Sequence, residues 1–108
     1  MDVESVVFKI IYHGGDAKAL AYEALQLAHD GNFTEADEKM KEANKTLNKA
    51  HLTQTELIQA EINGEDVDIS LLVVHAQDHL MTAISEMSLI EQMMKLLKRV
   101  HHLEEKMN

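Results

Sequence analysis

Two histidines and an aspartate lie close together in the last third of the chain, at His75, Asp78 and His79. On a helix, side chains at i, i+3 and i+4 share one face. A neutral imidazole has a lone pair that can attack a phosphoryl group, and polar neighbours can orient the ring and hold phosphate oxygens. The same spacing suits a transition metal, but the zinc motif H-E-x-x-H is incomplete, because Ala76 stands in place of glutamate. A hydrogen-bonded interface histidine is the third interpretation, and the spacing leaves all three open.

The surroundings of these residues indicate an interface. At about 100° per residue, the segment 70–97 has one wide apolar sector, expected to face the core, with Leu72, Val73, Ala76, Leu80, Ala83, Ile84, Met87, Ile90 and Met94. A second, narrower sector contains His75, Asp78, His79, Thr82, Ser85 and Glu86, and it continues at its ends into Leu71, Leu89, Met93, Leu96 and Leu97. An exposed strip of leucine and methionine usually marks an interface, and self-association is the simplest way to cover it.

Self-association would also give the carboxylates a role. In a cyclic homo-oligomer the strip would face the symmetry axis and bring copies of Asp78 or Glu86 together. Converging carboxylates repel each other unless they are protonated or bind a cation, and oxygen ligands of this kind suit Mg²⁺ or a similar hard ion. Asp78 is therefore the candidate metal ligand.

Long helices must position these residues, because the chain has no proline and is rich in strong helix formers. The first break in the helical pattern is at Gly31, a C′-type glycine, followed by Asn32 as an N-cap candidate in a capping box. The second is the polar, acidic stretch 63–68, after which Asp68 or Ser70 is expected to cap the next helix.

The predicted fold is all-α, an antiparallel up-down-up three-helix bundle with helices at about 3–30, 33–62 and 70–106. The apolar residues of the first two helices step by threes and fours, and many are alanines, which indicates closely packed helices. In the second helix the series is Phe33, Ala36, Met40, Ala43, Leu47, Ala50, Gln54 and Leu57. Gly14 and Gly15 interrupt the first helix, either as a kink or close crossing or as room beside a site.

Composition indicates a single domain over residues 1–108 and excludes several functions. The absence of cysteine rules out disulfides, thiolate zinc sites and a cysteine nucleophile, and it fits a reducing, cytoplasmic compartment. Because the start has no basic leader and no apolar run approaches about 18 residues, we expect neither secretion nor membrane insertion. The formal charge of -9 repels phosphate backbones, so nucleic-acid binding is not expected.

The segment 71–82, LLVVHAQDHLMT, resembles the active-site signature of enzyme IIA of the lactose/cellobiose (N,N′-diacetylchitobiose) class of the bacterial sugar phosphotransferase system (PTS). The resemblance extends over nearly the whole chain, through ALAYEAL at 19–25, GNF at 31–33 and LNKAHLTQT at 47–55. A long run with this residue order is specific, unlike a lone histidine.

This resemblance implies a phosphohistidine carrier built as a homotrimer of three-helix bundles. The family's phosphorylated histidine falls on His75, and its trimer-axis aspartate, which shares a metal ion among subunits, falls on Asp78. Gln77 and His79 match flanking positions, for which orienting or phosphate-stabilising roles are expected. HPr would phosphorylate His75, and a cysteine of the cognate IIB protein would then receive the group for a sugar entering through the membrane permease IIC. The chain would be a phosphotransferase component and not a complete catalyst.

Two other functions stay open from the residues alone. A histidine phosphotransfer domain of two-component signalling is also helical, but it usually has Lys and Gly shortly after the histidine, where this chain has Asp78, His79 and Leu80. A non-catalytic helical assembly module would be favoured if His75 proved inert. A carrier never touches the sugar, but the residues at 76–79 favour a β-linked disaccharide of the cellobiose or chitobiose type over lactose.

Overall fold

The computed structural model describes residues 2–108 and consists of three long helices joined by two short connections. They are α1 (Val3–His29), α2 (Phe33–Ile62) and α3 (Leu71–Met107), and no strand occurs in the described part of the chain. Each helix begins and ends within one residue of the predicted position. The prediction of an all-helical fold with three helices is confirmed.

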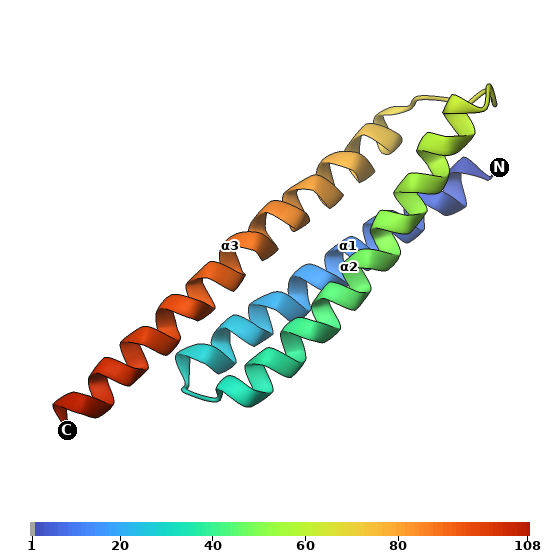
Figure 1. The fold of residues 1–108 in the computed structure, drawn as a ribbon. Coiled ribbons are helices and arrows are strands. Elements are labelled where there is room, and N and C mark those ends of the chain that lie inside the picture. Colours follow the sequence, from blue (N-terminus) through green and yellow to red (C-terminus); the bar gives the residue numbers. More distant parts are fainter. Residues whose placement is uncertain (1) are drawn as a thin grey trace.

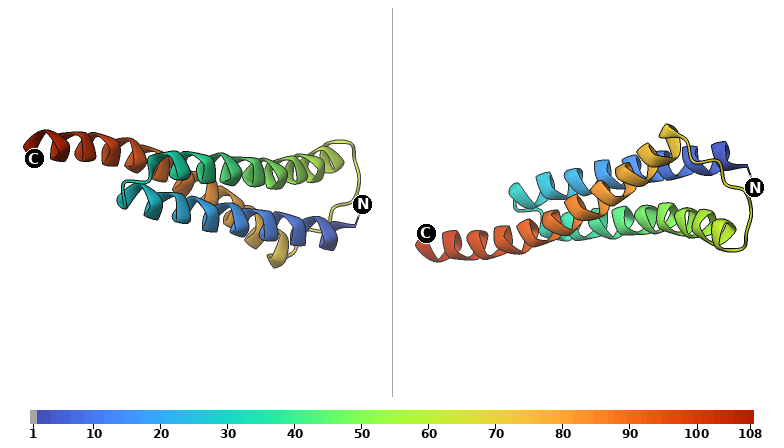
Figure 2. Two further views of the ribbon diagram at one scale, coloured as in Figure 1. Left: turned by 90° about the horizontal axis from the view of Figure 1, so that it is seen from below. Right: turned by 90° about the horizontal axis from the view of Figure 1, so that it is seen from above.

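The helices form an elongated molecule of 63 × 20 × 17 Å, in which the chain reverses direction at each connection (Figure 1). α1 and α2 pack side by side as a hairpin, and α3 packs chiefly on α1 and makes few contacts with α2. Figure 2 shows α3 crossing the hairpin at an angle and extending past the turn between α1 and α2. Much of the surface of α3 is therefore left uncovered by the other two helices.

The turn between α1 and α2 is closed by backbone hydrogen bonds around Gly31, which has a positive φ of 82°. The N–H groups of Gly31 and Asn32 donate to the carbonyl oxygens of Ala28 and Leu27, at 3.1 and 2.9 Å, in the pattern of a Schellman motif. The predicted capping box is wrong, because the side chain of Asn32 makes no capping hydrogen bond. The Schellman closure holds Asn32 at φ -89° and ψ 66°, outside the extended conformation of an ordinary N-cap.

The start of α3 follows the prediction. The Ser70 hydroxyl oxygen accepts a hydrogen bond from the backbone N–H of Val73 at 3.3 Å, so that Ser70, and not Asp68, is the N-cap. This cap fixes where α3 begins, only a few residues before the histidines.

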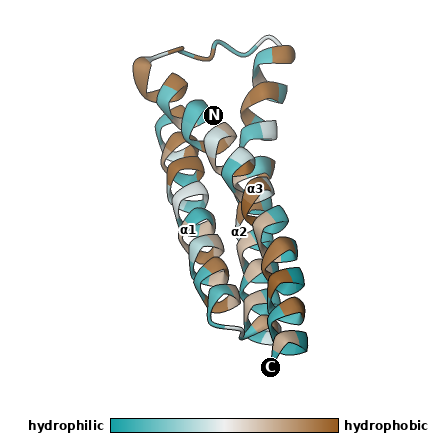
Figure 3. Cartoon of the chain, turned by 90° about the vertical axis from the view of Figure 1, so that its left-hand side faces the viewer, coloured by the Kyte–Doolittle hydropathy of each residue, from teal (hydrophilic) through white to brown (hydrophobic). Residues whose placement is uncertain are grey.

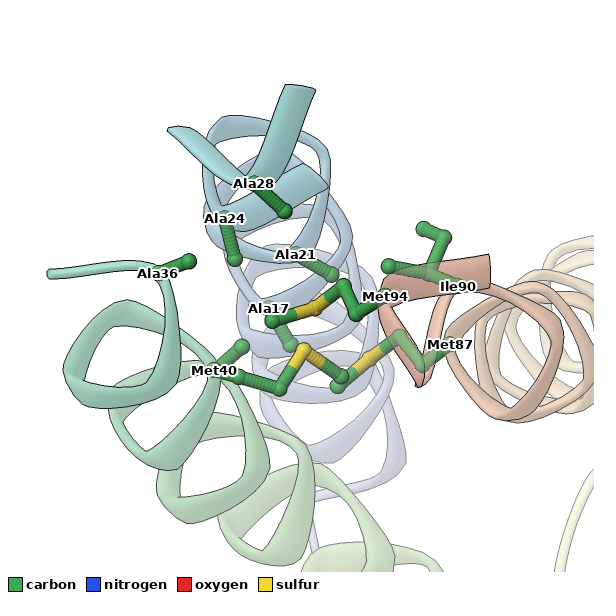
Figure 4. Close-up of a cluster of buried hydrophobic side chains, with 10 residues drawn as sticks. Ala17, Ala21, Ala24, Ala28, Ala36, Met40, Met87, Ile90 and Met94 are labelled. Carbon is green, nitrogen blue, oxygen red and sulfur yellow. The ribbon is translucent and has the colours of Figure 1, made fainter. Parts of the chain in front are cut away.

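Two clusters of buried side chains hold the helices together. Near the α1–α2 turn, Met40 on α2 and Met87 and Met94 on α3 reach toward one another across the buried alanines of α1 (Figure 4). α2 and α3 make few contacts with each other. The long, unbranched methionine side chains can fill the irregular space between them. The cluster at the other end is built mainly from branched side chains, namely Val6, Val7, Ile10, Ala50, Leu57, Val73, Ala76 and Leu80.

One predicted core residue lies at the surface. Leu72 is 39% exposed, because at the start of α3 it is bordered mainly by the first turns of α1, where it lines a hollow with Val3 and Val7. Hydrophobic residues recur along the whole of α3 (Figure 3), and many of them are exposed. Within residues 2–108, none of the helices has an apolar stretch of the length that crossing a membrane requires.

Candidate functional site

His75 and Asp78 lie on a face of α3 that residues 2–108 leave uncovered, and both are exposed. His75, Leu71 and Leu72 line an open hollow of about 520 Å³. Leu71 is 85% exposed, so the imidazole is bordered by apolar surface. A second protein can therefore reach the ring of His75 directly.

His79 lies one helical turn after His75 and is turned toward α1. Its residue is only partly exposed, and its ring lies nearly parallel to that of His75, with ring centroids 6.1 Å apart and planes inclined by 25°. On its other side, a Cβ added to Gly14 would lie 3.5 Å from Cδ2 of His79, and one added to Gly15 would lie 3.4 Å from Nε2. The structure thus brings two imidazoles together, one open to solvent and one against the backbone of α1.

This placement bears on the interpretations of Gly14 and Gly15, of which a kink is the one that the structure does not show. α1 runs through both without a break, and within residues 2–108 a positive φ occurs only at Gly31 and Gly64. No backbone conformation therefore requires these glycines, although each destabilises a helix by about 1 kcal/mol relative to alanine. Both glycines lie against the ring of His79, which a Cβ at either position would contact.

The polar sector predicted on α3 divides into two. Glu86 is partly buried, and its Oε2 lies 3.1 Å from Nζ of Lys18 on α1. Asp78 and Thr82 stay exposed, and the Thr82 hydroxyl donates a hydrogen bond to the backbone carbonyl oxygen of Asp78. Since Lys18 on α1 already pairs with Glu86, Asp78 is the carboxylate of this sector that has no partner within residues 2–108. Nothing in the sequence pattern marked Lys18.

Gln77 is directed away from His75 within the chain. Its side-chain carbonyl oxygen accepts a hydrogen bond from the amide of Gln54 on α2, which is buried. This pair links α2 to α3 where the two helices otherwise make few contacts. The sequence contained a sign that Gln54 is unusual, because it is a polar residue within the apolar series of the second helix.

Residues 2–108 contain no complete metal site. Over residues 2–108, no group of three or more His, Asp and Glu side chains is placed to hold a metal ion, so His75, Asp78 and His79 do not converge on one ion. The Asp78 carboxylate is exposed and has no hydrogen-bond or ion-pair partner in the described part of the chain. It fits a hard cation only if other copies supply further oxygen ligands.

His101 is a further histidine with defined contacts. The His101 ring packs edge-on against Phe33, with centroids 5.3 Å apart, and its Nε2 lies 3.1 Å from Oε1 of Glu105. It stabilises the α1–α2 turn far from His75 and plays no part in the site.

The family model described as "PTS system, Lactose/Cellobiose specific IIA subunit" matches residues 5–98. The chain belongs to this IIA family. It is 41% identical over 99 residues to the lichenan-specific phosphotransferase enzyme IIA component of Bacillus subtilis, an alignment that covers 92% of this chain and 90% of the relative.

Two solved IIA structures are similar to the whole fold. The crystal structure of the cellobiose-specific enzyme IIA from Bacillus anthracis has a TM-score of 0.90 and 44% identity, with 94% of each chain covered. The IIA(Chitobiose) chain of Escherichia coli, solved in solution in complex with HPr, has a TM-score of 0.80 and 37% identity, with 94% of this chain and 98% of that chain covered. Other relatives are named for galactose, cellobiose and lactose.

The predicted resemblance is therefore confirmed, and the chain is a phosphotransferase component of a sugar PTS. This sets aside the alternative of a histidine phosphotransfer domain of two-component signalling. The family match covers α2 and most of α1 and α3, and it includes His75, His79 and Asp78.

Proposed function

We propose that His75 is the phosphoryl-accepting residue of this IIA subunit and that HPr is its donor. The observation that carries the proposal is the exposed imidazole of His75, bordered by exposed leucine side chains, on a chain of this family. Support for HPr comes from the E. coli relative that was solved in complex with it. The net charge of -9 also suits a partner with a basic docking surface.

In the proposed step, the lone pair of an imidazole nitrogen of His75, which we assign to Nε2, attacks the phosphorus atom in line. The bond from phosphorus to the donor atom on HPr breaks, and its electron pair stays with that atom. In the next step a cysteine thiolate of the cognate IIB protein attacks the same phosphorus and returns the lone pair to His75. The sugar that enters through the permease IIC finally receives the group.

His79 and Gln77 serve this step in different ways. His79, with its ring centroid 6.1 Å from that of His75, is placed to orient the nucleophile or to donate a hydrogen bond to phosphoryl oxygens. Gln77 acts indirectly, because its bond to Gln54 fixes α3 against α2 and so sets the position of the helix that carries His75. We therefore assign Gln77 a positioning role.

We further propose that three copies of the chain assemble through the outer strip of α3. This strip contains the exposed side chains Leu71, Leu89, Met93, Leu96, Val100, Leu103 and Met107, with His75, Asp78, Thr82 and Ser85 filling the interval between Leu71 and Leu89. Its spacing of three and four residues is that of a helix-packing seam, and in one chain the strip is left open to water. The proposed number of copies, three, comes from the resemblance to the family.

At the centre of such a trimer, three copies of Asp78 would hold one divalent cation, Mg²⁺ or a similar hard ion. The cation would neutralise the convergent carboxylates and offset part of the charge that phosphorylation of His75 adds. The support within the chain is that the Asp78 carboxylate is exposed and unpaired in the described residues, whereas Glu86 is paired with Lys18.

For the sugar, we propose a β-linked disaccharide of the cellobiose or chitobiose type. The relatives in B. subtilis, B. anthracis and E. coli are named for lichenan, cellobiose and chitobiose, and others are named for galactose and lactose. Because the IIA surface carries the phosphoryl group and does not bind the sugar, the cognate IIB and IIC proteins are where this choice is to be tested.

The experiment that tests the carrier function is transfer from phosphoenolpyruvate through enzyme I and HPr to this protein. Intact mass is read at neutral or alkaline pH, because phosphohistidine is acid-labile. We expect a gain of one phosphoryl group in the wild type and none in His75→Ala. No gain with active HPr from a matching host, or an equal gain in His75→Ala, would contradict the assignment.

A further inference from the structure

Gly14 and Gly15 are neighbours in the middle of α1, and a side chain added at either position would contact the ring of His79. A Cβ at Gly14 would lie 3.5 and 4.0 Å from Cδ2 and Nε2 of His79, and a Cβ at Gly15 would lie 3.4 Å from Nε2. No atom of any other side chain of residues 2–108 comes within 4 Å, apart from those of adjacent residues. We call this surface of Gly14 and Gly15 the glycine notch, and His79 alone occupies it.

Alanine is the small residue that α1 uses elsewhere for close packing. Four fully or almost fully buried alanines follow along the same face, at Ala17, Ala21, Ala24 and Ala28. A methyl group at Gly14 or Gly15 would fit at van der Waals distance, but it would close off the Cδ2–Nε2 edge of the His79 ring. Glycine therefore leaves free space along that edge, which alanine would fill.

That space matters because of what lies on the other side of the ring. The ring of His75 is stacked against His79, and phosphorylation would add between about 1.5 and 2 negative charges and three acceptor oxygens there. Methyl groups at positions 14 and 15 would contact the His79 ring and limit its freedom to turn on that side. The notch gives His79 this freedom on the side of α1, while Ile10 and Leu80, both buried, fix the two helices close by.

We propose that Gly14 and Gly15 are positioning residues for phosphoryl transfer at His75. The notch holds His79 beside His75 and leaves its ring room to turn toward the phosphoryl oxygens. This inference rests on the proposed function of His75. The two glycines have no reactive group, and they affect the rate of phosphoryl transfer only through His79.

The test compares Gly15→Leu with Asp16→Leu, which adds a similar side chain at the next residue of α1, where the wild-type side chain is exposed. We expect Gly15→Leu to slow phosphoryl transfer from HPr by on the order of tenfold to a hundredfold, measured by rapid quench and intact mass. Asp16→Leu should retain the wild-type rate. Ring proton chemical shifts of His75 and His79 should change in Gly15→Leu and stay in place in the control.

A double-mutant cycle separates this role from a structural one. In a His79→Ala background the imidazole is gone, so leucine at position 15 has space and should slow transfer no further. If Gly15→Leu does not fold, Gly15→Ala replaces it, with a smaller slowing that again disappears in the His79→Ala background. Equal slowing in both backgrounds, or no slowing by either substitution, would overturn the inference alone. A wild type that accepts no phosphate would instead overturn the proposed function, and this role with it.

Discussion

Two faces of the first half of α3 each carry a histidine and a carboxylate, but the surroundings of the two faces differ. On the face toward α1, His79 lies in the glycine notch and Glu86 lies 3.1 Å from Lys18. On the outer face, His75 and Asp78 are exposed, and neither side chain has a hydrogen-bond or ion-pair partner within residues 2–108. The inner face is covered by α1 of the same chain, whereas residues 2–108 leave the outer face exposed.

This difference separates stability from function along one helix. Groups on the inner face contribute to the fold, so substitutions there should change the free energy of unfolding. Groups on the outer face contribute little to the fold of one chain, and substitutions there should change transfer or assembly. His79 belongs to both sides of the comparison, because it packs on α1 and stacks on His75.

The largest expected effect separates the two histidines. His75→Ala should abolish phosphorylation, whereas His79→Ala should still accept one phosphoryl group, on the order of tenfold to a hundredfold more slowly. Time-resolved intact mass with phosphorylated HPr measures both variants. If His79→Ala were the inert variant and His75→Ala accepted the group, the assignment of the two faces would be reversed.

A pair of leucines tests the same contrast through stability. Leu80 is fully buried and Leu89 is 58% exposed on the outer strip. Leu80→Ala should lower the free energy of unfolding by about 2–5 kcal/mol through the cavity it leaves, as measured by denaturant unfolding at a fixed protein concentration. Leu89→Ala should change the fold of one chain little and weaken self-association, as measured by sedimentation velocity. Equal losses of stability in both variants, without a change in self-association, would contradict the proposed interface.

Asp78→Asn tests whether the outer carboxylate meets other copies. In the proposed trimer this substitution removes three convergent charges, which should abolish stoichiometric binding of a divalent cation and change the stability of the assembly, while His75 still accepts phosphate. Metal content of the purified protein and its sedimentation velocity give the two readings. Unchanged metal content would contradict the assignment of Asp78 as a ligand, and Glu86→Gln is the matched control, since Glu86 is paired with Lys18.

The smallest effect is expected at that inner ion pair. The side chains of Lys18 and Glu86 are each 33% exposed, so water screens their attraction. Glu86→Gln should lower the free energy of unfolding by less than about 1 kcal/mol and leave phosphoryl transfer at the wild-type rate. Thermal unfolding at low and high salt checks this, because the difference between variant and wild type should shrink as salt increases. A large effect on transfer would place Glu86 with the functional face.

Much of the fold was predictable because its signals are local. The chain has no proline, so nothing interrupts the long helices. Gly31, with its positive φ, marks the end of α1, and the Ser70 cap marks the start of α3. The alanine series of α1 identified its buried face. The side-chain capping role predicted for Asn32 was wrong because a Schellman closure and a side-chain cap compete for the same turn. The burial of Leu72 was overestimated because a wheel treats every turn of a helix as equally covered, whereas the start of α3 lies at the edge of the bundle.

The sequence by itself determined the three helices, the family signature around His75 and the presence of a second apolar strip on α3, since periodicity and residue order are properties of the chain alone. Only the tertiary structure decided that α3 packs chiefly on α1, that Gln77 bonds to Gln54, that Glu86 pairs with Lys18 and that His79 occupies the glycine notch. The physical reason is that a wheel gives the direction of a side chain about its own helix. What lies in that direction depends on how the helices cross, and many distant contacts set that crossing together.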